Sequence, residues 1–271
     1  MPVAVIGAGA VGLACARALA RGGADVVVLE RGRVGEGCSY GNTGWICPAL
    51  SAPLPAPNVM GRSLAGMLHR DSPLRIQARL RREFLRWSWG FWRASTAERY
   101  EAGLRATVAF GARAFELYDE LESELDVRVH RTGMVVAALT ERGLEEYVDM
   151  IEGARRAGYD GPVETLDGDE VRRREPAVAD GVVGGLAVPA ERYVRPEELT
   201  RALAAHLREG GVDLREGAEV TRLAWRAGRW RVGAGDETLE ADRVVLAAGA
   251  WSGRLLATLG VRIPLEAAKG Y

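Results

Sequence analysis

Residues 1–32, MPVAVIGAGAVGLACARALARGGADVVVLERG, contain the pattern that decides the fold. The apolar run Val3–Ile6 predicts a buried strand, and the stretch after the next glycines predicts a helix that ends near Arg21. Val26–Leu29 is a second continuous apolar run, as expected for a strand of a parallel sheet covered on both faces. The segment therefore predicts a strand–helix–strand unit.

A glycine-rich turn joins the first expected strand to the helix, with Gly7, Gly9 and Gly12 in a GxGxxG pattern, and Glu30 ends the second strand. In this context the pattern is the dinucleotide-binding fingerprint. The glycines permit a tight turn, close approach of a pyrophosphate and close helix–strand packing, while the helix N-terminus attracts phosphate. The Glu30 carboxylate can accept hydrogen bonds from ribose hydroxyls. The fingerprint itself does not distinguish FAD from NAD.

The rest of the chain divides into an irregular loop, a helical region and a strand-rich part. Residues 32–61 are rich in glycine and proline, which is typical of a functional loop. Residues 62–125 are expected to be helical, with their aromatic side chains in the core: Phe84, Trp87, Trp89, Phe91 and Trp92. Further strands are expected at Met134–Leu139, Val182–Val188, Val212–Leu214, Glu219–Trp225, Arg229–Val232 and Arg243–Leu246, and further helices at Glu141–Arg156 and Pro196–Arg208.

The composition excludes several classes of partner. The 36 basic and 37 acidic residues leave a net charge of −1, which gives no electrostatic footprint for nucleic acid. Three cysteines without a CxxC pair and three dispersed histidines predict reduced thiols and no metal site. The N-terminal apolar run lacks a basic segment ahead of it, so we expect a cytoplasmic protein. Arg79–Arg86 is interpreted as a solvated helix face, with peripheral contact at the inner face of the plasma membrane as the alternative.

A second motif follows Glu30. Ser39, Asn42 and Gly44 form a Ser-x-x-Asn-x-Gly pattern, and a proline-spaced stretch comes after it. This loop resembles the flavin loop of bacterial D-amino-acid dehydrogenases, which belong to the D-amino-acid-oxidase-like family of FAD-dependent oxidoreductases. Val244–Ser252 is similar to the family's second strand and turn near the cofactor. The resemblance covers essentially the whole chain and implies that the cofactor is FAD.

The resemblance also implies an activity. A hydride passes from the substrate Cα to flavin N5, and the resulting imine hydrolyses to a 2-oxo acid. The expected substrate is a D-amino acid, and the electron acceptor is a quinone, a dye or O2. Oxidation of glycine, sarcosine, hydroxyproline or a hydroxy acid, a nicotinamide dehydrogenase and a non-catalytic dinucleotide-binding fragment are alternatives. No catalytic residue is named. The implied cofactor-binding residues are Gly7, Ala8, Gly9, Ala10, Val11, Gly12, Glu30, Arg31, Ser39, Asn42, Thr43, Gly44, Trp45, Val220, Ala248 and Gly249.

The expected fold class is α/β, with a Rossmann-like FAD-binding domain and an inserted α+β substrate domain. The FAD-binding domain is expected at residues 1–75 and 191–262, the substrate or cap domain at 76–190, and a returning substrate-domain strand from residue 263 to residue 271. Because members of the family are longer, we expect both domains to be incomplete at the C-terminus. The arginine that holds the substrate carboxylate is expected beyond residue 271, so these residues alone are expected to show negligible turnover.

Overall fold

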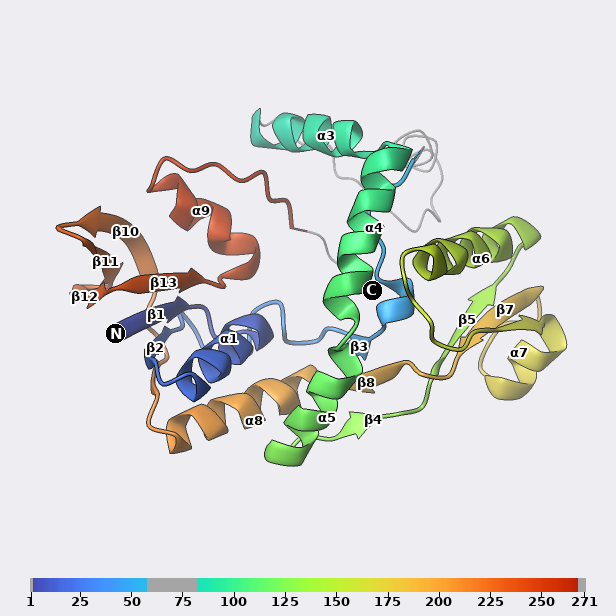
Figure 1. The fold of residues 1–271 in the computed structure, drawn as a ribbon, viewed down its shortest axis with the longest axis horizontal. Helices are drawn as coiled ribbons and strands as arrows, with labels where there is room; N and C mark the ends of the chain where they lie inside the picture. Colours follow the sequence, from blue (N-terminus) through green and yellow to red (C-terminus); the bar gives the residue numbers. More distant parts are fainter. Residues whose placement is uncertain (1, 58–81, 268–271) are drawn as a thin grey trace. The chain divides into compact units, whose positions relative to one another are not determined.

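The computed structural model describes residues 2–57 and 82–267 (Figure 1). The chain forms two compact units: Met1–Gly44, Glu122–Arg128 and Val194–Tyr271 make the first, and Trp45–Leu121 and Val129–Tyr193 make the second. Each unit contains its own sheet. The domain boundaries expected at residues 75, 190 and 262 stay a prediction.

The sheet of the first unit is parallel and four-stranded, in the order β13-β1-β2-β9. Ile6, at the end of β1, lies opposite both Leu29 of β2 and Leu246 of β13. Because parallel strands end at a common edge, the residues that follow β1, β2 and β13 lie together there. The four strands are β1 (Pro2–Ile6), β2 (Asp25–Leu29), β9 (Asp213–Arg215) and β13 (Arg243–Leu246).

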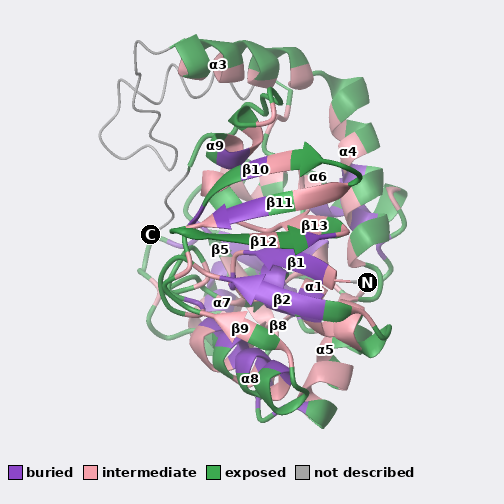
Figure 2. Cartoon of the chain, turned by 90° about the vertical axis from the view of Figure 1, so that its left-hand side faces the viewer, coloured by how far each residue is buried: buried purple, intermediate pink, exposed green. Residues whose placement is uncertain are grey.

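Both faces of this sheet are covered (Figure 2). Two helices pack on one face, where Leu13 and Leu203 are buried completely or nearly so. On the other face Ile6 packs in one cluster with Val232 and Leu255, which belong to an antiparallel sheet and a short helix. This burial on both sides explains why β1 and β2 are continuous apolar runs. The covering elements are α1 (Ala10–Arg21), α8 (Pro196–Glu209), β10 (Val220–Arg226), β11 (Arg229–Ala234), β12 (Glu237–Ala241) and α9 (Ser252–Ala257).

The second unit contains an antiparallel sheet in the order β5-β7-β6 and a smaller one in the order β3-β8-β4. Leu104 and Val108 of α4 pack with Ile151 of α6 and with Leu186 and Val188 of β7 in one core cluster. The elements are β3 (Trp45–Ile46), η1 (Pro48–Leu50), α3 (Arg82–Ala94), α4 (Ala97–Gly111), α5 (Ala114–Glu124), β4 (Val129–His130), β5 (Met134–Ala138), α6 (Glu141–Arg156), β6 (Glu164–Asp167), α7 (Gly168–Arg174), β7 (Gly184–Val188) and β8 (Arg192–Val194).

The expected α/β fold class is confirmed, and the helix expected at Glu141–Arg156 has the predicted bounds. The aromatic prediction is wrong: α3 contains no buried residue, and Trp89 and Trp92 are exposed. Sequence analysis missed β6, α7 and β12, which are short and flanked by charged residues. Residues 261–267 are irregular and residues 268–271 lie outside the described residues, so the returning strand stays a prediction, as does helix over residues 62–81.

Candidate cofactor site

The glycine turn lies between β1 and α1, at the carboxyl edge of the parallel sheet. Gly7 has φ +104°, and its N–H donates to the Leu29 carbonyl at 2.8 Å. A Cβ on Gly7 would lie 2.6 Å from the Ala247 carbonyl oxygen, and one on Gly12 would lie 1.9 Å from the Gly7 carbonyl oxygen. Both positions therefore need glycine for the packing of strand, turn and helix, whatever the site binds.

Gly9 differs from these two glycines. It has extended backbone, with φ −78° and ψ 178°, which any residue can adopt. A Cβ there would approach only the Ser39 hydroxyl oxygen, at 3.0 Å. The fold itself therefore tolerates a side chain at Gly9 better than at Gly7 or Gly12. A glycine here keeps free the space in front of the helix N-terminus, as close approach of a pyrophosphate requires.

The N-terminus of α1 presents backbone donors. Its N-cap is Gly9, which has no side chain to cap the helix, and its first turn carries no acidic residue. The Ala10 N–H donates to the Ser39 hydroxyl at 2.9 Å. The following N–H groups, of Val11 and Gly12, have no acceptor within the helix by its geometry. Donors and the positive end of the helix dipole together fit a phosphate.

Glu30 follows β2 and is held beside the glycine turn. Its Oε2 accepts the Ala8 N–H at 2.8 Å, and its Oε1 accepts the Gly32 N–H at 2.9 Å. The carboxylate thus has a fixed position within the first unit, and each oxygen keeps a further lone pair. The Glu30 carbonyl also accepts the Ala218 N–H at 2.8 Å, which ties the segment leading into β10 to the same place.

Arg31 is placed by an aromatic ring. Its guanidinium carbon lies 4.0 Å from the ring centroid of Trp251. Trp251 ends η2 (Gly249–Trp251), the short helix that begins just after Ala248. Trp251 lies within the family-like segment Val244–Ser252, but the sequence did not identify it as a partner of the site. Nothing in the spacing of these two residues could indicate their contact.

The loop pattern Ser-x-x-Asn-x-Gly forms a network of local bonds. Asn42 Oδ1 accepts the Gly44 N–H at 2.7 Å, and Asn42 Nδ2 donates to the Ser39 carbonyl at 3.1 Å. Gly44 has φ +64°, and a Cβ there would lie 1.8 Å from the Val194 carbonyl oxygen, so only glycine fits. The Gly41 N–H donates to Glu197 of α8 and lowers the pKa of that carboxyl. These bonds explain why the loop needs Asn42 and Gly44 without any ligand.

The remaining candidate residues differ in their setting. Val220 is buried in the core of the first unit, which leaves only its backbone to face a ligand. Ala248 packs against the same core, and Gly249 has φ +53°. Thr43 is exposed. Trp45 is 60% exposed and pairs with Tyr193 in the second unit. The first unit thus brings together the glycine turn, Glu30, Ser39 and the Ala247–Ala248 turn.

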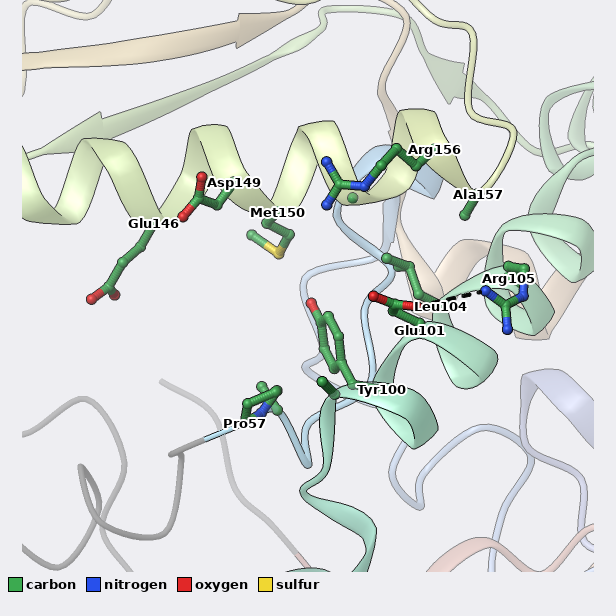
Figure 3. Close-up of a pocket in the computed structure, with 13 residues that line it drawn as sticks. Pro57, Tyr100, Glu101, Leu104, Arg105, Glu146, Asp149, Met150, Arg156 and Ala157 are labelled. Carbon is green, nitrogen blue, oxygen red and sulfur yellow. Dashed lines mark ion pairs between the residues drawn. The ribbon is translucent and has the colours of Figure 1, made fainter.

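The second unit contains a separate cleft of about 710 Å³ between α4 and α6 (Figure 3). Tyr100, Leu104 and Met150 line it together with charged side chains, among them Asp149 and Arg156. Burial raises the pKa of Tyr100. Sequence analysis did not identify this cleft, and it contains none of the predicted cofactor-binding residues.

A buried carboxyl group in the second unit was also missed. Glu191 is fully buried, and its Oε1 accepts the Ala49 N–H at 3.2 Å. Burial raises the pKa of Glu191 to about 7, and burial together with Glu191 raises the pKa of the Cys47 thiol to about 11. Glu191 Oε2 and the Tyr159 hydroxyl are both buried, and neither has a hydrogen-bond partner of acceptable geometry among the described residues. Among the described residues, no group of His, Cys, Asp and Glu side chains is arranged to hold a metal ion.

A parallel sheet with a glycine turn at its carboxyl edge, an anion-binding helix end and a carboxylate beside them defines a dinucleotide-binding α/β protein. Residues 2–271 match the family DAO, FAD dependent oxidoreductase, and the chain belongs to this family. Its cofactor is FAD, and the prediction of FAD rather than NAD is confirmed.

Solved structures of three other proteins share the fold. Glycine oxidase from Geobacillus kaustophilus is 23% identical, with a TM-score of 0.66 over 95% of this chain and 58% of that one. L-Proline dehydrogenase from P. horikoshii is 20% identical, with a TM-score of 0.67 over 96% and 56%. FAD-bound L-α-glycerophosphate oxidase from Mycoplasma pneumoniae is 16% identical, with a TM-score of 0.63 over 93% and 55%. The chain thus spans little more than half the length of these proteins.

Proposed function

We propose that this FAD-dependent oxidoreductase oxidises the carbon–nitrogen bond of a small amino acid, with a D-amino acid as the expected substrate. The oxidoreductase class and the cofactor follow from the family. The amine substrate is supported by the amino-acid-dehydrogenase-like loop at Ser39–Gly44 and by structural neighbours that include a glycine oxidase and a proline dehydrogenase. Bound FAD would accept the hydride from the substrate Cα, and the imine would hydrolyse in water.

The observation that carries the proposal is the bond between Ser39 and Ala10, because it joins the flavin-type loop to the phosphate-binding helix end. In the proposed site the pyrophosphate lies at the N-terminus of α1, next to Gly9 and Val11. Glu30 accepts the ribose hydroxyls, Arg31 lies along the adenosine, and the backbone of Val220 faces the adenine. The segment Asn42–Trp45 and the turn at Ala248–Gly249 lie nearer the flavin ring.

The chain's own residues supply binding and orientation in this proposal. The glycine turn excludes side chains from the pyrophosphate position, and the network at Asn42 fixes the loop that follows Ser39. No described side chain is assigned as a catalytic base. The electron acceptor is proposed to be a quinone or dye-type acceptor, or O2.

The test is a substrate panel assayed on the purified flavoprotein. D-Alanine, other D- and L-amino acids, glycine, sarcosine, proline and hydroxyproline are compared by dye reduction and by O2 consumption. Turnover restricted to D-amino acids supports the proposal. Bleaching of the bound flavin is also followed under anaerobic conditions. An amine that bleaches the flavin is a substrate even where the electron acceptor in the turnover assay does not react. No bleaching by any amine, in a flavoprotein that also contains the expected carboxylate-binding arginine, would contradict the substrate class.

A second candidate is oxidation of a carbon–oxygen bond, because L-α-glycerophosphate oxidase shares the fold. Glycerol 3-phosphate and small hydroxy acids therefore belong in the same panel. The third candidate is a non-catalytic dinucleotide-binding protein. In that case FAD should bind, and no compound of the panel should bleach it.

The proposed location is the cytoplasm, or the inner face of the plasma membrane as a peripheral protein. Within the described residues, no helix combines the length and the apolar character needed to cross a bilayer.

A further inference from the structure

The helix α3 presents aromatic side chains to solvent. Trp89 is 60% exposed, Leu85 57% and Trp92 54%, and none of the side chains of α3 is buried. Figure 1 shows α3 next to the start of α4, at a distance from the β5-β7 strands of the same unit. Exposed apolar side chains gathered in this way mark an interaction surface.

The helix also has little of the packing that normally stabilises a helix of its length, because five of its residues are half-buried and none is buried. α3 has 13 residues, and helices shorter than about 12–15 residues are marginal in water without tertiary contacts. Gly90 in its interior costs about 1 kcal/mol relative to alanine. Among the described residues, the aromatic rings of α3 contact one another, with the Phe84 ring centroid 6.0 Å from that of Trp87 and the Trp89 centroid 5.0 Å from that of Trp92. A second surface would supply the missing burial.

The charges of α3 indicate the chemistry of that surface. Arg82, Arg86 and Arg93 follow at spacings of four and seven residues, so they share one face of the helix. Leu85, Trp89 and Trp92 follow at spacings of four and three residues, on the flank of the arginines. All three arginines are exposed. Their charge is therefore available to an anionic surface.

We propose that α3 binds the surface of an anionic lipid bilayer. Trp89, Trp92 and Leu85 would enter the boundary between headgroups and acyl chains, where tryptophan is favoured. The arginines would contact lipid phosphates while their aliphatic stems lie along the apolar boundary. Arginines beside tryptophans on one helix match such a boundary, which is apolar on one side and negatively charged on the other. This inference does not depend on which substrate the enzyme oxidises.

The experiment is co-sedimentation of the purified flavoprotein with vesicles. Phosphatidylcholine vesicles are compared with vesicles of phosphatidylcholine mixed with phosphatidylglycerol. We expect binding to the mixed vesicles that weakens with added salt. Trp89→Ser combined with Trp92→Ser should weaken binding by roughly 10- to 100-fold, because two large apolar side chains lose their burial. Arg82→Glu combined with Arg86→Glu should weaken it at least roughly 10-fold on the mixed vesicles.

Matched controls separate α3 from general surface effects. Phe110→Ser removes a side chain that is 95% exposed on α4, and Arg142→Glu with Arg156→Glu makes the same charge change on α6. Both should bind vesicles like the wild type, and every variant should keep its flavin absorbance. A wild type that stays in the supernatant with mixed vesicles would overturn the proposal, as would equal losses in α3 and control variants. A wild-type dimer that the tryptophan substitutions dissociate, without any vesicle binding, would assign α3 to a second copy instead.

Discussion

The hydroxyl of Ser39 accepts a hydrogen bond from the backbone N–H of Ala10 at 2.9 Å, although 29 residues separate them in the chain. The bond connects the loop after β2 to the first turn of α1. The Ser39 hydroxyl keeps its own proton for donation to a further acceptor. The position of the loop after β2 is therefore coupled to the phosphate-binding end of α1 through one side chain, that of Ser39.

The Ser39→Ala variant should lose both the coupling and some stability. Ala10 N–H loses its acceptor, which resembles removal of a helix N-cap and costs about 1 kcal/mol. We expect FAD to bind roughly 5- to 10-fold more weakly, by loss of one hydrogen bond. The measurements are urea denaturation and titration of apoprotein with FAD. Ser51→Ala, which removes a bond to the Cys47 carbonyl in the second unit, is the control and should leave FAD affinity unchanged. Equal affinities of wild type and Ser39→Ala would contradict the coupling.

The Gly9→Val variant should separate ligand binding from folding. Its side chain would fill the space in front of the helix, where only the Ser39 hydroxyl lies near. We therefore expect flavin content to collapse while circular dichroism changes little and the free energy of unfolding of the apoprotein falls by no more than about 1 kcal/mol, from displacement of the Ser39 hydroxyl.

Gly12→Ala is the matched comparison, because its Cβ would lie 1.9 Å from the Gly7 carbonyl oxygen. Helix and turn would have to separate, at a cost of about 1–3 kcal/mol or more in stability. Thermal denaturation of the two apoproteins measures the contrast. If Gly9→Val keeps its FAD, or if Gly12→Ala is as stable as the wild type, the division of roles between the two glycines is wrong.

Glu30→Ala tests the ribose contact. Removal of a charged hydrogen-bond acceptor should weaken FAD binding by about 1–3 kcal/mol, or roughly 5- to 150-fold. Asp25→Ala, at the opposite end of β2, is the control because it makes the same charge change far from the turn. The measurement is titration of both apoproteins with FAD. If the two variants bind FAD with similar affinity, Glu30 does not contact the ribose and only accepts the Ala8 and Gly32 N–H groups.

The glycine turn and Glu30 were predictable from the sequence because the patterns that identify them are local. The turn from Gly7 to Gly12 and the strand ending before Glu30 combine short-range spacing with continuous apolar runs, and both follow simple rules of helix and sheet geometry. The partners that hold these residues were not predictable in the same way. Trp251 follows β13 and reaches Arg31 after β2 although β1 lies between these two strands, and Ser39 reaches Ala10 because the loop after β2 returns to the first turn of α1.

The aromatic helix shows the limit of periodicity. Apolar side chains on one face of a helix predict that the face is covered, but they do not say by what. The side chains of α3 have the pattern of a core helix, yet none of them is buried, and Leu85, Trp89 and Trp92 are exposed. Glu191 gives no sequence signal at all, since a glutamate in a turn is ordinarily solvated. Its burial arises from the packing of η1, Tyr159 and the β7–β8 turn.

Glu191 should make stability depend on pH. Its folded-state pKa of about 7 lies above the ordinary value of 4.5, because burial disfavours the carboxylate. Below the ordinary pKa the group is protonated in both folded and unfolded chains. Between the two values the folded protein keeps the proton that the unfolded chain loses. The contribution to stability is therefore fully present at low pH and is lost as pH rises through 7, by about 3 kcal/mol in total.

The Glu191→Gln variant isolates this effect, because its amide oxygen can still accept the Ala49 N–H and cannot titrate. The free energy of unfolding is measured by urea denaturation at about pH 5 and about pH 8 for both proteins. We expect the wild type to lose more stability than Glu191→Gln over this interval, and the difference to reach a few kcal/mol. Glu209→Gln, an exposed position at the end of α8, is the control and should follow the wild type. Parallel pH profiles for wild type and Glu191→Gln would mean that the Glu191 carboxyl titrates near its ordinary value, and that the space around Oε2 and the Tyr159 hydroxyl admits water.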